Sequence, residues 1–402
     1  MAEPEASHYP ILQRACETVT ATVATDPHLS SKEAHVDVHG WSEQCSNVGR
    51  YMNRSPISDR QDPAEGCLGC LTMASPTMKA VIFHAHGPSS VLTLSDSVPK
   101  PTPGPEDVLI KLEYAGVNFV DTYVRNGLYP TPLPCTTGRE GAGVIEAIGA
   151  SVPAEQYGLV VGDKVAVFSP GSMAEYMVAP AKGVLKLPPG VSTREGAAIM
   201  LQGLTAWTLC RDAHEVKPGE TVLVQAAAGG TGGLLVQMCK ALGATVIGTC
   251  SSEEKAAIAK GHGADHVVNY KTHDVEDEVN RITGGKGCHA VFSGVGKDTL
   301  AKDIAMTRRK GTFVTFGNSS GAIAGVKPLD LSKRNIKMVR PTLANYITER
   351  EEFELRSGEL LALVKEGKVK IHFGKEYSLE GVAQAQDDLV SGQTVGKLIV
   401  KI

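Results

Sequence analysis

The sequence lacks the features that mark a membrane protein or a general binder of nucleic acids. Its 402 residues contain no run of 18 apolar residues, which a membrane-spanning helix would need. Positive charge is not in excess, because 40 Lys and Arg residues stand against 44 Asp and Glu residues. The formal net charge of −4 gives no general attraction for polyanions. With 42% apolar and 21% charged residues, the composition is that of an ordinary globular protein.

Cysteine is too sparse and too irregularly spaced for a disulfide scaffold, which indicates a reducing compartment, and we expect the protein in the cytoplasm. The nine residues are Cys16, Cys45, Cys67, Cys70, Cys135, Cys210, Cys239, Cys250 and Cys288. The one tight pair is Cys67-Leu-Gly-Cys70, which lacks a second pair to complete a metal site. We interpret it as two free thiols.

Residues 1–77 have no sustained apolar periodicity and are rich in Ser, His, Asp, Glu and Pro. The segment contains twice as many acidic as basic residues, unlike a mitochondrial transit peptide, and it has no apolar stretch typical of a secretion signal. Such a composition cannot bury enough apolar surface to offset the entropy of ordering. We predict that residues 1–77 are a disordered extension and that order begins at Met78.

The predicted secondary structure of the rest of the chain changes near Gly203. Residues 78–202 are mostly β, with strands predicted at Lys79–Phe83, Asp107–Glu113, Gly141–Gly149 and Asp163–Phe168. From Gly203 strands alternate with helices: strands at 221–225, 245–249, 266–270, 290–292 and 311–316, and a helix at 234–242. Repeated β–helix–β units predict a doubly wound parallel sheet, a Rossmann domain, over 203–337. Residues 338–402 end in a helix and a strand at Lys397–Ile402.

A glycine-rich turn lies between the first strand and the first helix of the predicted Rossmann domain. Gly229, Gly230 and Gly232 allow a tight turn whose backbone N–H groups can approach a pyrophosphate, next to the positive end of a helix. The pattern departs from a strict G-x-G-x-x-G, so a glycine-rich turn without a ligand stays the alternative. Its place between strand and helix favours a dinucleotide site.

The end of the second strand indicates which dinucleotide. NAD-binding domains usually place an acid there to accept from the ribose hydroxyls. This chain has Gly248-Thr-Cys-Ser-Ser252, with Lys255 on the next helix, and Ser251-Ser-Glu-Glu254 is a predicted capping box for that helix. A neutral rim with a cation suits the 2′-phosphate of NADP, although a solvated surface lysine is the alternative.

With these residues the chain resembles the zeta-crystallin-like quinone oxidoreductases of the medium-chain dehydrogenase/reductase superfamily, particularly fungal and bacterial members. The resemblance covers residues 78–402. Its motifs are Ala115-Gly-Val-Asn-Phe-Val-Asp-Thr-Tyr-Val-Arg-Asn-Gly-Leu-Tyr-Pro130, Leu201-Gln-Gly-Leu-Thr205, Ala226-Ala-Ala-Gly-Gly-Thr-Gly232, Phe316-Gly-Asn-Ser-Ser-Gly321 and Val339-Arg-Pro341. The resemblance implies a GroES-like catalytic domain, made of 78–202 and 338–402, with the Rossmann domain inserted and the active site in the cleft. It also implies NADPH as cofactor and a homodimer.

The resemblance also implies residue roles. Asn118 contacts the nicotinamide end of the cofactor. Lys255 and Tyr270, with Ser251 or Ser252, grip the 2′-phosphate. Phe316, Asn318 and Ser319 lie at the nicotinamide ribose. Tyr123, Tyr129 and Arg340 face the substrate and are the candidate catalytic residues. Two positions depart from the family pattern: Ser293 replaces an acid, and Gly392 replaces an Arg, for which Lys397 could compensate at a cofactor phosphate.

The ligands of the zinc-dependent relatives are missing. Where those relatives have Cys and then Gly-His-Glu, this chain has Asn118 and Asp121 and then Gly138-Arg-Glu140. Glu140 alone does not hold zinc in an open tetrahedral site. We therefore predict no bound metal.

Without a Lewis acid, alcohol oxidation is disfavoured, whereas hydride addition to an electron-poor acceptor needs none. We predict NADPH-dependent reduction of quinones. The alternatives are a 2-alkenal or enoyl reductase acting on α,β-unsaturated carbonyls, and binding of AU-rich messenger RNA, for which no RNP motif, KH loop or basic-aromatic tract is present.

Overall fold

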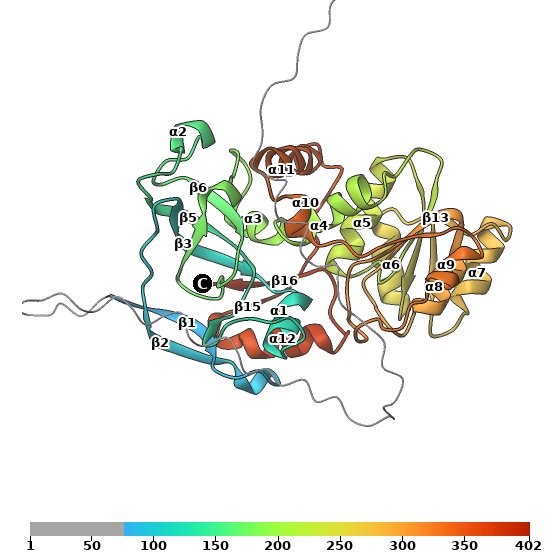
Figure 1. Ribbon diagram of the computed structural model, residues 1–402, viewed down its shortest axis with the longest axis horizontal. Helices are drawn as coiled ribbons and strands as arrows, with labels where there is room; N and C mark the ends of the chain where they lie inside the picture. Colours follow the sequence, from blue (N-terminus) through green and yellow to red (C-terminus); the bar gives the residue numbers. More distant parts are fainter. Residues whose placement is uncertain (1–75) are drawn as a thin grey trace, which may run out of the picture. The chain divides into compact units, whose positions relative to one another are not determined.

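The computed structural model describes residues 76–402, and Figure 1 shows their arrangement. The predictions for residues 1–75, namely disorder and the free thiols of Cys67 and Cys70, lie outside the described residues. The first strand begins at Thr77, one residue before the predicted start of order. Among residues 76–402, no helix is both long enough and apolar enough to cross a membrane.

Two main sheets organise the described chain. The first has seven strands in the order β15-β16-β3-β5-β6-β8, with β7 paired to β3, and all its pairs are antiparallel except β15 with β16. Its strands are β3 (Asp107–Gly116), β5 (Glu140–Ile148), β6 (Lys164–Phe168), β7 (Tyr176–Pro180), β8 (Val184–Lys186), β15 (Phe373–Tyr377) and β16 (Lys397–Lys401). A small sheet pairs β1 (Thr77–Phe83) with β2 (Thr93–Pro99) and β4 (Cys135–Thr136).

The C-terminal strand belongs to the same sheet as strands β3 to β8 from the first half of the described chain. Ile399 of β16 pairs with Gly116 of β3, so segments on either side of the parallel sheet in sequence share one β layer. This is the split β-rich domain that the resemblance implies, and the fold is a GroES-like β domain combined with a Rossmann domain. The exact domain boundaries at 202/203 and 337/338 stay predictions.

The second sheet has six parallel strands in the order β11-β10-β9-β12-β13-β14. Its strands are β9 (Thr221–Val224), β10 (Thr245–Cys250), β11 (His266–Asn269), β12 (Cys288–Ser293), β13 (Thr307–Thr315) and β14 (Lys337–Val339). The strand order reverses next to β9, where the chain leaves for β10 on one side and β12 lies on the other. Ligands bind at such a switch point, beyond the carboxyl ends of the strands.

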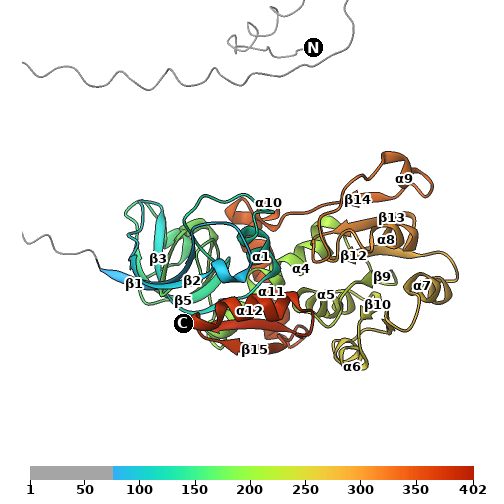
Figure 2. The same ribbon diagram turned by 90° about the horizontal axis from the view of Figure 1, so that it is seen from below.

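Helices cover both faces of the parallel sheet (Figure 2). Val222 and Val224 pack on one face with residues of α5 (Gly230–Ala241) and α6 (Glu253–Gly261). Leu223, between them in sequence, packs on the other face with α7 (Val275–Thr283) and α8 (Leu300–Met306). Strands buried on both faces explain the continuous apolar runs in this half of the sequence.

Of the remaining helices, α9 (Pro328–Ser332) packs against the parallel sheet, and the others connect the two sheets or cover the β-rich part. These others are α1 (Phe119–Arg125), α2 (Ala154–Tyr157), α3 (Thr193–Ile199), α4 (Gln202–Thr208), α10 (Leu343–Tyr346), α11 (Arg350–Lys365) and α12 (Val382–Val390), with a π-helical turn at Leu209–Ala213 and 3₁₀ turns at Ser89–Val91, Ala181–Gly183 and Leu379–Gly381. The core cluster that contains Leu204 of α4 also holds Leu360 of α11 and Ile399 of β16. One apolar core therefore extends from the parallel sheet to the C-terminal strand.

Three predicted elements differ at their ends. Helix α5 begins at Gly230 instead of Leu234, because the glycines adopt helical geometry without a side chain that would collide with the turn. The cap of α6 is Ser252, not Ser251: its backbone is extended and its hydroxyl accepts from the Lys255 N–H at 3.3 Å. Strand β13 begins at Thr307, four residues before the predicted start, and pairs there with Cys288.

The shared core makes a prediction for the C-terminal strand. Ile399 is 0% exposed, so Ile399→Ala should lower the free energy of unfolding by about 2–5 kcal/mol through lost burial and a new cavity. The matched control is Leu329→Ala on α9, where the side chain is 76% exposed and the change should be within about 0.5 kcal/mol. Chemical denaturation measures both. Equal stability of the two variants would contradict the shared core.

Candidate functional site

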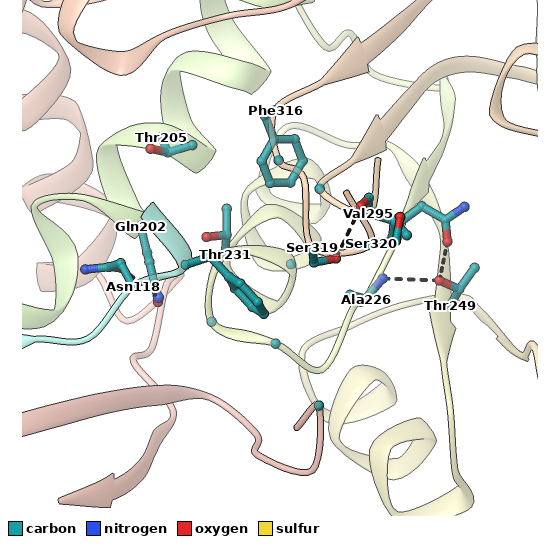
Figure 3. Close-up of a pocket in the computed structure, with 18 of the residues that line it drawn as sticks. Asn118, Gln202, Thr205, Ala226, Thr231, Thr249, Val295, Phe316, Ser319 and Ser320 are labelled. Atoms are coloured by element: carbon teal, nitrogen blue, oxygen red, sulfur yellow. Dashed lines mark hydrogen bonds between the residues drawn. The ribbon is translucent and has the colours of Figure 1, made fainter. Parts of the chain in front are cut away.

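A cavity of about 1360 Å³ opens beyond the carboxyl ends of the parallel strands. Its walls come from both sheets: α1 and the β5–β6 side of the β-rich part, and the loops after β9, β10, β12 and β13 of the parallel part. The volume exceeds that of a typical pocket for a single small ligand, and it accommodates a dinucleotide together with a second reactant. Figure 3 shows the part of this cavity around the glycine-rich turn.

The glycine-rich turn follows β9 and leads directly into α5, a helix of 12 residues. Ala226 takes a left-handed conformation, with φ of 54°, at the point where the chain turns back. A Cβ on Gly232 would lie 2.2 Å from the carbonyl oxygen of Ala226, so only glycine fits there. The turn thus presents backbone N–H groups and a helix N-terminus to the cavity, which is the physical requirement for binding a pyrophosphate.

A buried polar network supports this turn from below. Gln225 donates to the Asp303 carboxylate at 2.7 Å and accepts from the Thr249 hydroxyl at 2.6 Å. The hydroxyl of Thr249 in turn accepts from the Ala226 N–H at 3.2 Å (Figure 3). Burial raises the pKa of Asp303 above its usual value. Many relatives have an acidic residue at the position of Ser293. In this chain, the carboxylate of Asp303 on α8 lies close to Ser293 instead. The sequence did not predict this role of Asp303.

As the sequence predicts, no acidic residue stands at the carboxyl end of β10, and the cavity edge there is formed by neutral side chains and Lys255. Ser251, Lys255 and Tyr270 all line the cavity there. The Lys255 ammonium donates to the Gly392 carbonyl at 2.5 Å, and the Tyr270 ring is 53% exposed. Ser252 does not line the cavity, because its hydroxyl caps α6. Of the two serines proposed beside Lys255, the structure therefore places Ser251 in the cavity.

The three candidate catalytic residues lie together at the opposite end of the cavity. Arg340 donates to the Tyr129 hydroxyl at 3.0 Å, and the rings of Tyr123 and Tyr129 meet edge to face with centroids 5.4 Å apart. The Asn318 N–H donates to the Tyr123 hydroxyl at 3.0 Å. With the amide oriented to satisfy both of its ends, Asn318 accepts from Tyr129 at 3.2 Å and from Arg340 at 3.0 Å.

Asn318 does not lie where the resemblance places it, at the nicotinamide ribose. Its amide is engaged with Tyr129 and Arg340, and the residue does not line the cavity, whereas Phe316 and Ser319 do. Burial raises the pKa of Tyr123 to about 12, so its hydroxyl stays protonated at neutral pH and acts as a hydrogen-bonding group. The cluster joins the loop after β13 to α1 across the cavity.

A buried network of polar side chains lies behind the cavity wall at Asn118. Lys397 is 2% exposed and Glu140 is 0% exposed, and the two form an ion pair. Asn118 donates to Glu140 at 2.7 Å and accepts from Lys397 at 3.0 Å. Lys397 is therefore not at a cofactor phosphate: the compensation for Gly392 proposed from the sequence is wrong, because the ammonium is buried against a carboxylate.

Gln202 completes this wall and was not singled out from the sequence. It donates to the Asn118 side-chain oxygen at 3.1 Å and lies beside it in Figure 3. Its own oxygen has no hydrogen-bond partner in the described part of the chain, although the residue is only 8% exposed. A Cβ on Gly230 would lie 2.1 Å from that oxygen, so the amide covers the first residue of α5. Gln202 is part of the motif Leu201-Gln-Gly-Leu-Thr205, but nothing in the sequence of that motif predicts that its amide is buried.

Asp121 lies beneath the same wall. One of its oxygens accepts from the Asn118 N–H at 2.8 Å, and the other has no partner. Burial raises the pKa of Asp121 to about 7, while the charges of Lys397 and Arg139 oppose that rise. Within residues 76–402, no three His, Cys, Asp or Glu side chains are arranged to hold a metal ion. The prediction of a metal-free enzyme stays a prediction for the whole chain.

The cavity gathers most of the predicted residues. All three candidate catalytic residues line it, and so do nine of the eleven residues predicted for the cofactor. Those nine are Asn118, Gly229, Gly230, Gly232, Ser251, Lys255, Tyr270, Phe316 and Ser319. It also has lining residues that the sequence analysis did not propose for binding, among them Arg139, Gln202 and Thr231.

Comparison with known proteins agrees with this arrangement. The "Alcohol dehydrogenase GroES-like domain" family matches residues 104–189, and the "Zinc-binding dehydrogenase" family matches residues 230–358. The chain is similar to a quinone oxidoreductase of Pseudomonas aeruginosa, at 38% identity over 80% of this chain and 99% of the relative. It is also similar to a 2-haloacrylate reductase of a Burkholderia species, at 36% identity over 80% of this chain and 98% of the relative.

Solved structures show the same architecture. The crystal structure of Escherichia coli quinone oxidoreductase complexed with NADPH matches 81% of this chain and 100% of its own, with 36% identity and a TM-score of 0.77. Identity above one third over nearly the whole length of these relatives, with both sheets and the cavity in place, shows the family. The chain belongs to the quinone oxidoreductase family of the medium-chain dehydrogenase/reductase superfamily.

Proposed function

We propose that this protein is an NADPH-dependent reductase of quinones. The observation that carries the proposal is one continuous cavity. At one end lies Lys255, beside the end of β10, where no acidic residue directly follows the strand. The cavity passes the glycine-rich turn and ends at Tyr123, Tyr129 and Arg340, so a site for the cofactor phosphates and a site for the acceptor are joined. The resemblance of the whole described chain to quinone oxidoreductases supports it.

The adenosine end of NADPH fits the rim of β10. The 2′-phosphate needs cations and hydrogen-bond donors, and an acid there would repel it. We assign Lys255 and Ser251 to this phosphate and Tyr270, with its exposed ring, to the adenosine. Within residues 76–402, the Lys255 ammonium has only a neutral carbonyl as its partner, so it can turn to a phosphate without leaving a carboxylate unpaired.

The pyrophosphate belongs at Gly229, Gly230 and Gly232, and the nicotinamide ribose at Phe316 and Ser319. For the nicotinamide end we retain Asn118. The amide of Asn118 is already engaged with Glu140, Lys397 and Gln202. Gln202, whose amide N–H donates to Asn118 and whose oxygen is buried against Gly230, holds Asn118 in place at this end.

When bound, NADPH supplies the hydride; the protein positions the reactants and excludes water. Tyr129 and Arg340 are hydrogen-bonded to each other at the acceptor end, and the Asn318 N–H holds Tyr123 beside them. These three side chains are placed to orient the oxygens of a quinone against the nicotinamide. We propose that the final proton comes from solvent.

A second candidate is reduction of an α,β-unsaturated carbonyl, which the similarity to a 2-haloacrylate reductase supports. It would use the same cavity and cofactor. Turnover of ortho-quinones against 2-alkenals, followed as NADPH oxidation, separates the two. Binding of AU-rich RNA is a third possibility from the resemblance, and filter binding with and without competing NADPH tests it. The homodimer and the cytoplasmic location also remain proposals.

Lys255 gives the sharpest test of cofactor choice. Lys255→Ala should raise the Michaelis constant for NADPH by roughly 10- to 150-fold, because a charge-assisted bond to phosphate contributes about 1.5–3 kcal/mol. The constant for NADH should change little. Lys260→Ala, an exposed lysine at the end of the same helix, is the matched control. Equal use of NADH and NADPH by the unmutated enzyme would refute the assignment.

The absence of zinc ligands gives a second test. Elemental analysis of the full-length protein should find well below one zinc per chain, and chelators should leave quinone reduction intact. The physical reason is that Asn118, Asp121 and Arg139 do not form the thiolate and imidazole set that an open zinc site needs. Stoichiometric zinc together with turnover that a chelator abolishes would overturn the metal-free mechanism.

A further inference from the structure

Arg139 is a cation of the cavity wall that the proposed function leaves without a role. Its backbone is held on both sides: the Arg139 carbonyl accepts from the Ser169 N–H at 3.0 Å, and the next residue, Glu140, is fully buried in the ion pair with Lys397. The Arg139 side chain is half-buried and lines the cavity, as do Asn118 and Phe168. Its position is therefore set by the fold and not by a free loop.

The guanidinium of Arg139 has no hydrogen bond or ion pair with any residue of the part of the chain that the structure describes. Two other cations of the cavity differ in this respect. Arg340 donates to the Thr315 carbonyl and the Tyr129 hydroxyl, and Lys302 pairs with Asp274 at 2.6 Å. The N–H donors of the half-buried Arg139 side chain are therefore free to bind a ligand in the cavity that this residue lines.

The nearest carboxylates cannot serve as its partner. Glu140 is already neutralised by Lys397, and Asp121 is buried beneath the wall with one oxygen bound to the Asn118 N–H. The charge of Arg139 acts on Asp121 only weakly compared with burial, which still raises the pKa of that carboxyl to about 7. Among residues 76–402, no carboxylate forms an ion pair with Arg139, whereas Glu140 and Lys397 balance each other.

Hydride addition to a quinone creates the charge that such a group would bind. The hydride forms a C–H bond at a ring carbon conjugated to a carbonyl, and the displaced π electrons move onto the carbonyl oxygen. The resulting enolate carries its negative charge on that oxygen until solvent protonates it, and loss of the proton from the new C–H bond then completes the tautomerisation to the hydroquinone. Preorganised donors aimed at developing oxygen charge are among the largest contributions to catalysis. An arginine suits this task because its planar fork donates two N–H groups and does not lose its own proton.

We propose that Arg139 is a catalytic residue that donates hydrogen bonds to the acceptor oxygen and stabilises the negative charge formed there during hydride transfer. The proposal rests on the proposed reduction of quinones. It assigns the electrophilic role to Arg139, and it leaves Arg340, which donates to the Thr315 carbonyl and the Tyr129 hydroxyl, to orient Tyr129 and the quinone.

The kinetic test compares Arg139→Gln and Arg139→Lys with Arg309→Gln, an exposed arginine of β13 that does not line the cavity. With an uncharged ortho-quinone, Arg139→Gln should lower kcat by about 100- to 1000-fold, the usual effect of losing one such donor. The KM for the quinone should change little, and Arg139→Lys should retain part of the activity. The dissociation constant of NADPH, measured by fluorescence, and the Tm should match those of Arg309→Gln.

Chemical rescue adds a criterion that a structural role would not meet. Guanidinium ions in solution should restore part of the activity of Arg139→Ala and leave Arg309→Gln unchanged. The proposal is overturned if kcat of Arg139→Gln stays within threefold of the unmutated enzyme, or if the NADPH dissociation constant rises in proportion to the lost activity. It is also overturned if the loss appears only as a higher KM for a sulfonated quinone, because Arg139 would then bind a substrate anion.

A binding measurement separates this proposal from the proposed function. 4-Nitrophenol in the presence of NADP⁺ mimics the product oxygen, and its absorbance reports whether it is ionised. Arg139 should lower the pKa of the bound phenol, and Arg139→Gln should abolish that shift. If the unmutated enzyme reduces no quinone, the proposed function fails while this titration still decides whether Arg139 binds an oxyanion. An unshifted pKa in the unmutated protein contradicts the proposal for Arg139.

Discussion

The buried ion pair between Lys397 and Glu140 is the interaction on which the cavity wall around Asn118 depends. Lys397 comes from β16 at the C-terminus and Glu140 from the start of β5, and neither is accessible to water. Removing two charges from water costs several kcal/mol each, which is offset only when every remaining donor and acceptor is satisfied. Here Glu140 also accepts from the Asn118 amide and from the Leu201 N–H, at 2.7 Å each, so the pair connects four segments of the chain.

The rest of the site follows from that arrangement. Asn118, held by the pair, holds Gln202, and Gln202 lies over the first turn of α5 where the glycine-rich turn ends. Arg139 is adjacent to Glu140 in the chain, and its side chain reaches the cavity. In the proposed function, the β-rich part would therefore supply the groups that face the reacting atoms, and the parallel sheet would bind the cofactor phosphates. The Tyr123–Asn318 and Arg340–Tyr129 hydrogen bonds fasten the two parts across the cavity.

Local patterns predicted the cavity lining beyond the ends of β9 and β10, and the contacts of these residues with a cofactor stay a proposal. The glycine-rich turn, the acid-free end of β10 and Lys255 are neighbours in sequence, and the strand–turn–helix context places them in space. The same reasoning gave the parallel sheet, and the resemblance gave the two tyrosines and Arg340 at the acceptor end. Helix ends were less accurate, because glycine turns and the choice between Ser251 and Ser252 as the cap depend on geometry that the sequence does not encode locally.

The missed residues share one physical cause: their roles depend on partners far away in the chain. Lys397 and Glu140 are 257 residues apart, and Gln225 and Asp303 are 78 apart. No spacing rule connects such pairs, so Lys397 was expected at a phosphate. Gln202 was read as part of a family motif, and Arg139 entered only as a departure from the zinc-ligand pattern. Asn318 was placed at the cofactor because its loop was recognised, whereas its own amide turns to Tyr129 and Arg340.

The unfolding free energy of Lys397→Met, measured alone and combined with Glu140→Gln, tests the organising role of the ion pair most directly. Lys397→Met alone leaves a buried carboxylate without its cation and should cost about 3–5 kcal/mol. Adding Glu140→Gln removes the stranded charge while keeping an acceptor for Asn118, so the double variant should recover part of that loss. A Lys397→Met protein as stable as the unmutated one, or a double variant no more stable than the single one, would contradict the account.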